Sequence, residues 1–266
     1  MDNRPIGIFD SGLGGLTVVK ELQRELPGES VIYFGDTGRV PYGSKSDDTI
    51  AGYTEEIFDF LKTKNVKAVV AACGTASSVI IKKNIIPEGI FTGVVVPSCL
   101  AAIERTKNGR IGVIGTKATV KSDSYASFIK KMNSSIEVFS LACPLFVPLV
   151  ENGMFEGDNE ITRLTVKHYL SFFEDKGIDT LILGCTHYPL LKGMISETVG
   201  SGVEIIDSGK ETAAIIKKML RKEDMLSSEE KGKYEFYVSD SVEDFSENAE
   251  IFLGREIRGE TYKKVL

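Results

Sequence analysis

The sequence predicts an α/β fold of two pseudo-symmetric domains, each a mainly parallel sheet flanked by helices, with the active site in the cleft between them. Short apolar strands alternate with amphipathic helices along the chain, which is the pattern of α/β proteins. Several strands are unbroken apolar runs, as expected for strands buried on both faces of a parallel sheet. Residues 69–77 (VVAACGTAS) also resemble residues 181–189 (LILGCTHYP), which indicates a repeated unit.

Each element of this pattern can be placed on the chain. Strands are expected at the short apolar runs, which are residues 5–9, 30–34, 68–72, 93–96, 110–114, 136–140, 180–183, 204–206 and 234–238. Helices are expected at the amphipathic segments, which are residues 16–26, 48–64, 76–84, 119–132, 160–176, 209–220 and 242–253. Ligands of such folds bind at the carboxyl ends of the strands.

The repeated unit also predicts the domain organisation. Residues 7–12 (GIFDSG) resemble residues 112–116 (GVIGT), so each half begins with a similar strand and turn. We expect the first domain to comprise residues 1–97 plus 208–266 and the second to comprise residues 98–207. The polar and charged stretch 222–233 is expected to be a surface loop.

Net charge and composition exclude several classes of partner. The net charge is −6, the pI is near 5.2, and no basic stretch stands out. Nucleic acids and anionic membranes are not expected to bind, because both attract clustered Lys and Arg. A small anionic substrate is compatible with this charge, since backbone N–H groups at helix starts bind carboxylates.

No apolar run approaches the roughly 18 to 20 residues of a membrane helix, and no signal peptide is recognisable, so a cytoplasmic protein is expected.

The cysteines are not arranged as metal ligands. The four residues, Cys73, Cys99, Cys143 and Cys185, are far apart, and none is in C-x-x-C spacing. Because the chain has only two histidines, no structural zinc or iron–sulfur site is expected. Disulfides are rare in cytosolic proteins. Four reduced thiols therefore remain to be explained by packing or by chemistry.

Polar residues follow several predicted strands, at the turns where the next helix begins. These residues are Asp10-Ser11, Tyr42-Gly43, Cys73-Gly74-Thr75 and Cys185-Thr186-His187. Ser11, Thr75 and Thr186 stand where a hydroxyl and free backbone N–H groups can bind a carboxylate. If both halves direct these turns to one cleft, the result is a small polar pocket flanked by two thiols.

Two thiols on opposite walls of a pocket suit the inversion of a stereocentre. Moving a proton from one face to the other needs a base on one side and an acid on the other, with the roles reversed in the back reaction. A thiol, with an unperturbed pKa of about 8.5, serves in both states once its surroundings lower that value modestly. His187 is the expected proton partner of Cys185, and Asp10 that of Cys73. Glu151 is a candidate to orient His187.

The same residues also have structural interpretations. A cysteine at the end of a buried strand is more often a small core residue than a reactive group. The matching contexts of Cys73 and Cys185 favour chemistry for that pair. Cys99 and Cys143 lack such contexts and are expected in the core, and His168, inside a predicted helix, is expected to be structural.

Two other functions are compatible with parts of the sequence. The stretch 12–17 (GLGGLT), with Asp36 about 20 residues on, faintly resembles the dinucleotide fingerprint of a nicotinamide-dependent oxidoreductase. The fingerprint fails because its third glycine falls on Thr17 and because Asp10 would place negative charge beside a pyrophosphate. A non-catalytic amino-acid-binding protein with two closing lobes shares the architecture, but it gives no reason for paired thiols.

Four motifs occur in a fixed order along the chain. They are DSGLGGLTV at residues 10–18, GDTGRVPYG at 35–43, ACGTAS at 72–77 and GCTHYP at 184–189. In order and spacing they resemble the motifs of the glutamate racemases, in the aspartate/glutamate racemase family. The resemblance runs from about residue 6 to residue 220, and the final segment is compatible with it.

This resemblance implies a racemase that needs neither pyridoxal nor metal and makes D-glutamate from L-glutamate for bacterial cell-wall peptidoglycan. By position, Cys73 and Cys185 are similar to the two catalytic acid/bases, and Asp10, Glu151 and His187 to the groups that assist them. The implied substrate-binding residues are Asp10, Ser11, Tyr42, Gly43, Gly74, Thr75, Thr186 and His187. The family is commonly dimeric, which implies a homodimer. Related racemases act on aspartate or hydantoins, and the DSGLGG and PYG segments favour glutamate.

One residue departs from the family pattern. The usual motif has asparagine after the first cysteine, and this chain has Gly74. The backbone N–H is retained, but a side-chain amide that could bind substrate is absent. A net hydrogen bond contributes roughly 0.5 to 1.5 kcal/mol. Gly74→Asn is therefore expected to leave the protein folded and racemising, with rate or affinity changed about tenfold or less.

Overall fold

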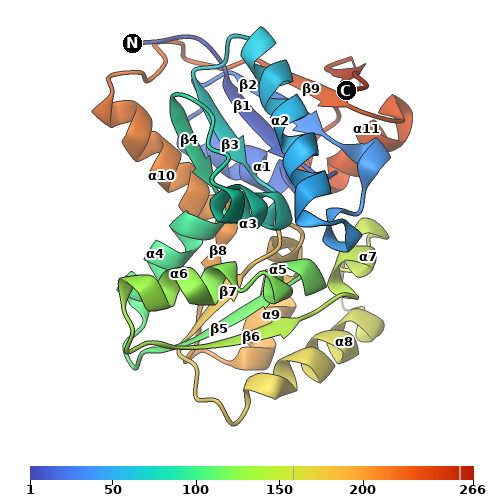
Figure 1. Ribbon diagram of the computed structural model, residues 1–266. Helices are drawn as coiled ribbons and strands as arrows, with labels where there is room; N and C mark the ends of the chain where they lie inside the picture. The colour runs from blue at the N-terminus through green and yellow to red at the C-terminus, as the bar shows by residue number, and fades with distance from the viewer. Residues whose placement is uncertain (158, 258) are drawn as a thin grey trace.

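The computed structural model describes residues 1–157, 159–257 and 259–266. Within these ranges the strands form two sheets, and every strand pairing is parallel. The first sheet has the order β10 (Thr261–Lys263), β9 (Tyr234–Val238), β2 (Val31–Gly35), β1 (Ile6–Asp10), β3 (Ala68–Ala71), β4 (Ile90–Gly93). The second has the order β6 (Glu137–Ala142), β5 (Arg110–Gly115), β7 (Thr180–Leu183), β8 (Glu204–Asp207). In Figure 1 the first sheet and both chain ends lie in the upper part of the molecule, and the second sheet lies in the lower part.

The two sheets share a core of four strands with the same connections. β1 pairs with β2 and β3, and β3 pairs with β4. In the second sheet, β5 pairs with β6 and β7, and β7 pairs with β8. The ends of β1 and β3 therefore correspond to the ends of β5 and β7. This arrangement confirms the predicted α/β fold of two similar halves.

Helices cover both faces of the first sheet. α1 (Leu16–Glu25), α10 (Ser208–Lys222) and α11 (Val242–Leu253) pack on one face, and α2 (Asp47–Thr63) and α3 (Gly74–Lys83) on the other. Successive residues of β1 point to opposite faces, so that Ile8 packs with α1 and Phe9 packs with α2. Because helices cover both faces of the sheet, both faces of β1 are buried, which explains its unbroken apolar sequence.

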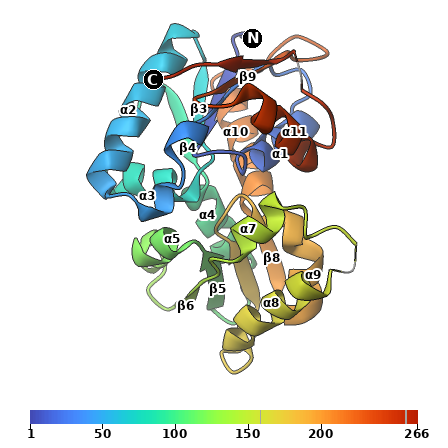
Figure 2. The same ribbon diagram turned by 90° about the vertical axis from the view of Figure 1, so that its right-hand side faces the viewer.

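The second sheet is covered in the same way, as the view in Figure 2 shows. α4 (Val95–Arg105) and α6 (Ser124–Met132) pack on one face. α7 (Phe146–Glu151), α8 (Glu160–Leu170) and α9 (Lys192–Val199) pack on the other. No helix among the described residues is long and apolar enough to cross a bilayer.

Several elements differ from the sequence prediction. The helix expected at residues 160–176 ends at Leu170, and β10, α4, α7 and α9 were not predicted. The strand expected at residues 93–96 is wrong, because β4 ends at Gly93 and α4 begins at Val95. The valines there form the first turn of a helix that buries Val95, Cys99 and Ala102 against the second sheet. The single helix expected at residues 119–132 is also wrong. It is divided into α5 (Lys117–Lys121) and α6 by Asp123, whose φ of 54° is incompatible with a continuous α-helix.

The domain boundaries at 97/98 and 207/208 stay a prediction. β1 to β4, β9 and β10 belong to one sheet and β5 to β8 to the other. α4 runs across the first boundary, and α10 begins at the second.

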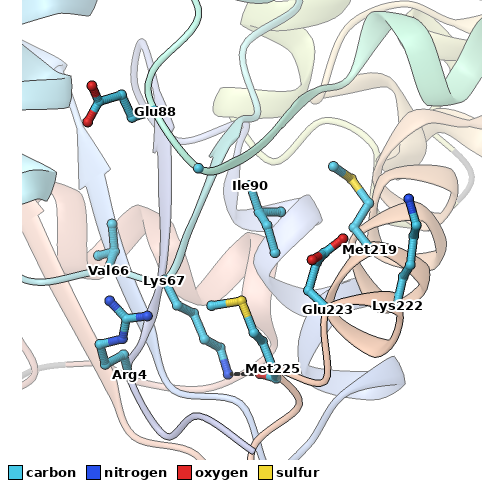
Figure 3. A pocket seen from close by; sticks show the side chains of 10 residues that line it. Arg4, Val66, Lys67, Glu88, Ile90, Met219, Lys222, Glu223 and Met225 are labelled. Carbon is cyan, nitrogen blue, oxygen red and sulfur yellow. Dashed lines mark hydrogen bonds between the residues drawn. The ribbon is translucent and has the colours of Figure 1, made fainter.

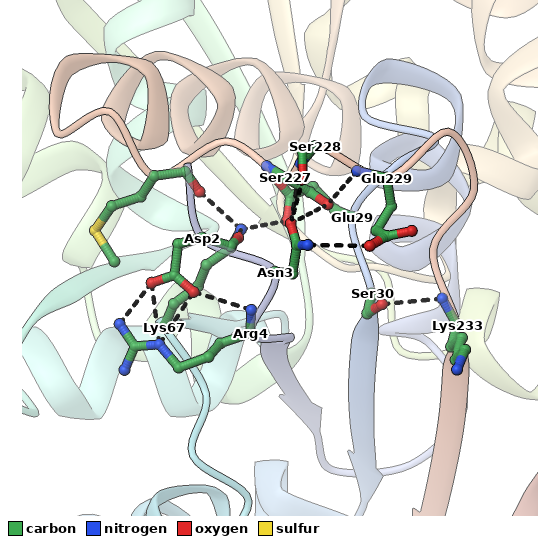
Figure 4. Close-up of polar contacts among 11 residues, drawn as sticks. Asp2, Asn3, Arg4, Glu29, Ser30, Lys67, Ser227, Ser228, Glu229 and Lys233 are labelled. Atoms are coloured by element: carbon green, nitrogen blue, oxygen red, sulfur yellow. Dashed lines mark hydrogen bonds and ion pairs between the residues drawn. The ribbon is translucent and has the colours of Figure 1, made fainter.

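A buried ion pair fixes the segment after α10 to the first sheet (Figure 4). The side chain of Lys67 is completely buried, and its Nζ lies 2.6 Å from Oε2 of Glu29. Nζ also donates to the carbonyl of Met225 at 2.7 Å, and Glu29 accepts a hydrogen bond from the backbone N–H of Ser227 at 2.8 Å. A buried charge is tolerated when it is paired and fully hydrogen-bonded. The stretch 222–233, predicted as a surface loop, has no helix or strand beyond Lys222 and is held by this cluster.

Candidate active site

Cavities open at both ends of the first sheet. At the amino ends of its strands, a cavity of about 660 Å³ is lined by charged and apolar side chains, among them Arg4, Lys67, Ile90 and Met219 (Figure 3). The described residues that line it include no cysteine, histidine or serine. This cavity therefore offers neither the thiols nor the imidazole that the predicted chemistry needs.

At the carboxyl ends of the strands lies a cavity of about 520 Å³ that is lined by residues from both halves. Every residue predicted for the site lines it: Asp10, Ser11, Tyr42, Gly43, Cys73, Gly74, Thr75, Glu151, Cys185, Thr186 and His187. Cys99 and Cys143 are completely buried elsewhere, in the cores of the protein. The structure thus brings the predicted residues together, and their individual roles stay predictions.

The two thiols occupy corresponding places in the two halves. Cys73 follows β3 and is the N-cap of α3, where its Sγ accepts a hydrogen bond from the N–H of Ala76 at 3.5 Å. Its thiol also donates to Oγ of Ser11 at 3.6 Å. Cys185 follows β7, the counterpart of β3. The two residues are only 6% and 8% exposed, so the surface that they retain faces the cavity that they line.

Cys73 lies in a buried and negatively charged environment. Burial raises the pKa of the Cys73 thiol to about 12, and the negative charge of Asp10 contributes in the same direction. The pKa of Asp10 is itself raised by burial, while His187 and the N–H of Gly12, at 2.9 Å, favour its charged form. Cys73 is therefore a protonated thiol at neutral pH.

Cys185 lies beside a cation. Nδ1 of His187 is 3.8 Å from Sγ of Cys185, and Nε2 is 3.0 Å from Oε1 of Glu151. Burial alone would lower the pKa of His187, but the hydrogen bonds to Cys185 and Glu151 outweigh it and raise the pKa to about 10. An imidazolium thus stands beside Cys185 at neutral pH, with Nδ1 facing the sulfur.

The loop that carries Tyr42 and Gly43 is held by a buried carboxylate. Asp36 is completely buried and accepts hydrogen bonds from the hydroxyl of Tyr42 at 2.5 Å, Nε of Arg39 at 2.7 Å and Oγ of Ser239 at 2.8 Å. The Tyr42 hydroxyl is therefore turned into the protein, which leaves the ring and backbone for the cavity. Asp36 is also unavailable to a ribose, which counts against the dinucleotide alternative.

Thr116, Lys117 and Thr119 are among the residues that line the cavity and that sequence reasoning missed. Thr116 follows β5, the counterpart of β1, and caps α5 by accepting the N–H of Thr119 at 3.2 Å. The match between residues 7–12 and 112–116 contained the signal, because it placed Thr116 at the same strand end as Ser11.

Fold and site together define a class of protein: an α/β chain of two similar halves that each bring a thiol to one cavity, an arrangement suited to proton exchange at a stereocentre. The model of the Asp/Glu/Hydantoin racemase family matches residues 6–216. The chain belongs to this family, and it is a racemase, an isomerase.

Relatives are similar over nearly the whole chain. The glutamate racemase of Geobacter metallireducens is 47% identical over 262 residues, which cover 98% of this chain and 96% of the relative. The structure of glutamate racemase isoform RacE1 from Bacillus anthracis has a TM-score of 0.92 at 37% identity, covering 100% of this chain and 98% of that one. A glutamate racemase from Francisella tularensis, in complex with D-glutamate, has a TM-score of 0.89 at 39% identity, with coverage of 100% and 98%.

Proposed function

We propose that this racemase converts L-glutamate to D-glutamate without a cofactor, with Cys73 and Cys185 as its two acid/base groups. The observation that carries the proposal is one thiol from each half in a single cavity, one near a carboxylate and the other beside an imidazolium. The relatives' names support glutamate as the substrate, and one related structure is a complex with D-glutamate.

In the proposed reaction, the thiolate of one cysteine takes the α-proton of the bound amino acid, and the electron pair moves onto the α-carbon and its carboxylate. The thiol of the other cysteine then gives its proton to the opposite face of the α-carbon. The configuration inverts, and thiol and thiolate have exchanged states. The imidazolium of His187 faces the sulfur of Cys185, and burial favours the protonated form of Cys73, so we propose Cys185 as the base and Cys73 as the acid.

The first turn of α3 is suited to hold the substrate carboxylate. Gly74 and Thr75 begin this helix and line the cavity. The first N–H groups of a helix have no acceptor within it, and they bind carboxylates well. Negative charge that develops on the α-carboxylate during proton transfer would be stabilised there. Asp10, Ser11 and the other predicted binding residues complete the same cavity.

The proposed product also suggests a role in the cell. D-glutamate would supply peptidoglycan synthesis. We accordingly propose that the protein acts in the cytoplasm, and the family resemblance favours a homodimer. The gene should restore growth to a bacterium that requires D-glutamate, and failure to do so despite normal expression would contradict this role.

The reaction is tested by following the circular dichroism of L-glutamate and, in parallel, L-aspartate with purified protein and no added cofactor. We expect the glutamate signal to fall to zero, far faster than the aspartate signal. Inversion of aspartate alone would overturn the proposed substrate. Activity that is lost on removing bound small molecules and restored by pyridoxal phosphate would overturn cofactor independence.

Gly74 is expected to tolerate a side chain less well than the sequence suggested. A Cβ at Gly74 would lie 2.7 Å from the carbonyl oxygen of Gly184, and Gly184 is itself fixed by its N–H, in the preceding peptide, which donates to the carbonyl of Ile114 at 2.7 Å. Gly74→Ala should therefore displace the peptide that precedes Cys185 and lower kcat/KM about tenfold.

The same backbone shift should lower kcat/KM of Gly74→Asn, unless the new side-chain amide binds substrate and offsets the loss. Steady-state kinetics of both variants check this prediction. Wild-type activity in Gly74→Ala would show that the Gly184 peptide moves freely.

Replacing Glu151 should shift the pH dependence of the reaction. The hydrogen bond to Glu151 helps to raise the pKa of His187 to about 10, so the imidazolium is lost only as the pH rises through about 10. Glu151→Gln removes the carboxylate and lowers this pKa, so the alkaline limb of kcat/KM should move to lower pH. Glu156→Gln, at an exposed acidic residue outside the cavity, is the control. An unmoved alkaline limb in Glu151→Gln would rule out this role for Glu151.

A further inference from the structure

The turn at residues 185–189 cannot complete its own backbone hydrogen bonds. The N–H of Tyr188 donates to the carbonyl of Cys185 at 3.1 Å, three residues before it. The corresponding donor for the carbonyl of Thr186 would be Pro189, which has no N–H. Because a buried carbonyl without a donor is costly, Thr186, only 4% exposed, needs a donor from elsewhere.

The missing donor comes from the other half of the protein. Oγ1 of Thr17, in the first turn of α1, lies 2.9 Å from the carbonyl oxygen of Thr186 and donates to it. The same hydroxyl lies 2.9 Å from the carbonyl of Gly14, but that carbonyl already accepts the backbone N–H of Thr17 at 3.1 Å. We assign the hydroxyl proton to Thr186, because the Gly14 carbonyl already has a donor, whereas no backbone donor to the Thr186 carbonyl is found among the described residues. Thr17 itself is 6% exposed and is not among the residues that line the cavity.

Gly14 supports the same turn by close contact. A Cβ at Gly14 would lie 2.3 Å from Oγ1 of Thr186 and 2.5 Å from Nδ1 of His187. Nδ1 is the ring atom that faces the sulfur of Cys185. The turn between β1 and α1 thus contacts both the backbone and the imidazole of the other half's acid/base group.

We propose that Thr17 is a positioning residue of the racemase. Its hydroxyl, in the first half, fixes the turn that carries Cys185 and His187 in the second half, and so sets where the base stands relative to Cys73. Thr17 acts through Thr186 and does not touch the substrate. The inference rests on the proposed function.

The test compares Thr17→Val, which removes the hydroxyl at nearly constant volume, with Thr17→Ser, which keeps it. Thr54→Val is the matched control, because Thr54 is also buried but its hydroxyl donates to Ile50 within α2. We expect Thr17→Val to lower kcat about ten- to hundredfold with a smaller change in KM. The alkaline limb of the pH profile of Thr17→Val should move to lower pH. The contact between His187 and Cys185 helps to raise the pKa of His187, so a longer contact leaves that pKa lower. Thr17→Ser should restore most of kcat, and Thr54→Val should leave kcat and the pH profile unchanged.

A second readout does not depend on racemisation. Alkylation of Cys185 by iodoacetamide, followed by mass spectrometry in the folded proteins, reports the stabilisation of its thiolate by His187. We expect slower alkylation in Thr17→Val than in wild type or Thr17→Ser. Equal kcat and equal alkylation in Thr17→Val and Thr54→Val would overturn the positioning role, as would a Thr17→Ser protein as impaired as Thr17→Val. A wild-type protein that inverts no glutamate would overturn the proposed function instead, while the alkylation rates would still decide the role of Thr17.

Discussion

Cys73→Ala and Cys185→Ala are each expected to abolish racemisation, with a loss of at least about a thousandfold in kcat. Each variant removes the proton carrier on one wall, and the cavity offers no second thiol on that wall to replace it among the residues described there. The remaining cysteine can deprotonate or protonate one face of the α-carbon, but it cannot invert the centre. Initial rates of D-glutamate formation, measured with a D-specific enzyme assay, check this prediction.

Cys99→Ala and Cys143→Ala are the matched controls. Both residues are 0% exposed and lie in the cores, so alanine should cost some stability and leave kcat near that of wild type. The comparison separates the chemistry of a thiol from the packing of a cysteine. Wild-type racemisation by either Cys73→Ala or Cys185→Ala would refute the two-base mechanism.

Gly14→Ala is expected to reduce kcat/KM about a hundredfold while the protein stays folded. The new methyl group would lie 2.5 Å from Nδ1 of His187 and 2.3 Å from Oγ1 of Thr186, which is far inside van der Waals contact. The methyl group must therefore displace Thr186, His187 or the turn that carries Gly14, which changes the contact of Nδ1 with the sulfur of Cys185, now 3.8 Å. Steady-state kinetics with L-glutamate and D-glutamate check the prediction in both directions.

Gly193→Ala provides the control for this substitution. A Cβ at Gly193, in α9, would meet nothing within 4 Å, so this variant should keep wild-type kinetics. Circular dichroism and the melting temperature report whether Gly14→Ala remains folded. A folded Gly14→Ala protein with wild-type kcat/KM would show that the position of His187 tolerates the displacement.

The sequence correctly predicted those strands and helices whose pattern of apolar residues matches their burial in the fold. β1 and β3 are unbroken apolar runs because both of their faces are covered by helices. The prediction failed where one pattern fits two structures. Residues 94–96 are consecutive valines, which suit a strand, but they stand at the start of α4, the helix that packs against the second sheet. The break at Asp123 has no glycine or proline to announce it.

The candidate site was predictable to the extent that its residues are adjacent in the chain. Cys73 and Cys185 were found because each follows a buried strand in a matching context. The roles of Gly14 and Thr17 depend on distances between segments about 170 residues apart, which no local pattern records. The orientation of the Tyr42 hydroxyl likewise depends on the burial of Asp36 by the surrounding fold.

The central claim is that two different groups handle the α-proton from opposite faces, and hydrogen exchange tests it most directly. Purified protein is incubated with L-glutamate in deuterated water, and both enantiomers are separated and analysed for α-deuterium during the first few per cent of conversion. The account predicts that the D-glutamate formed carries deuterium, while the recovered L-glutamate retains protium. D-glutamate that retains the original protium, or equal deuteration of both enantiomers from the start, would show that one group serves both faces and would contradict the account.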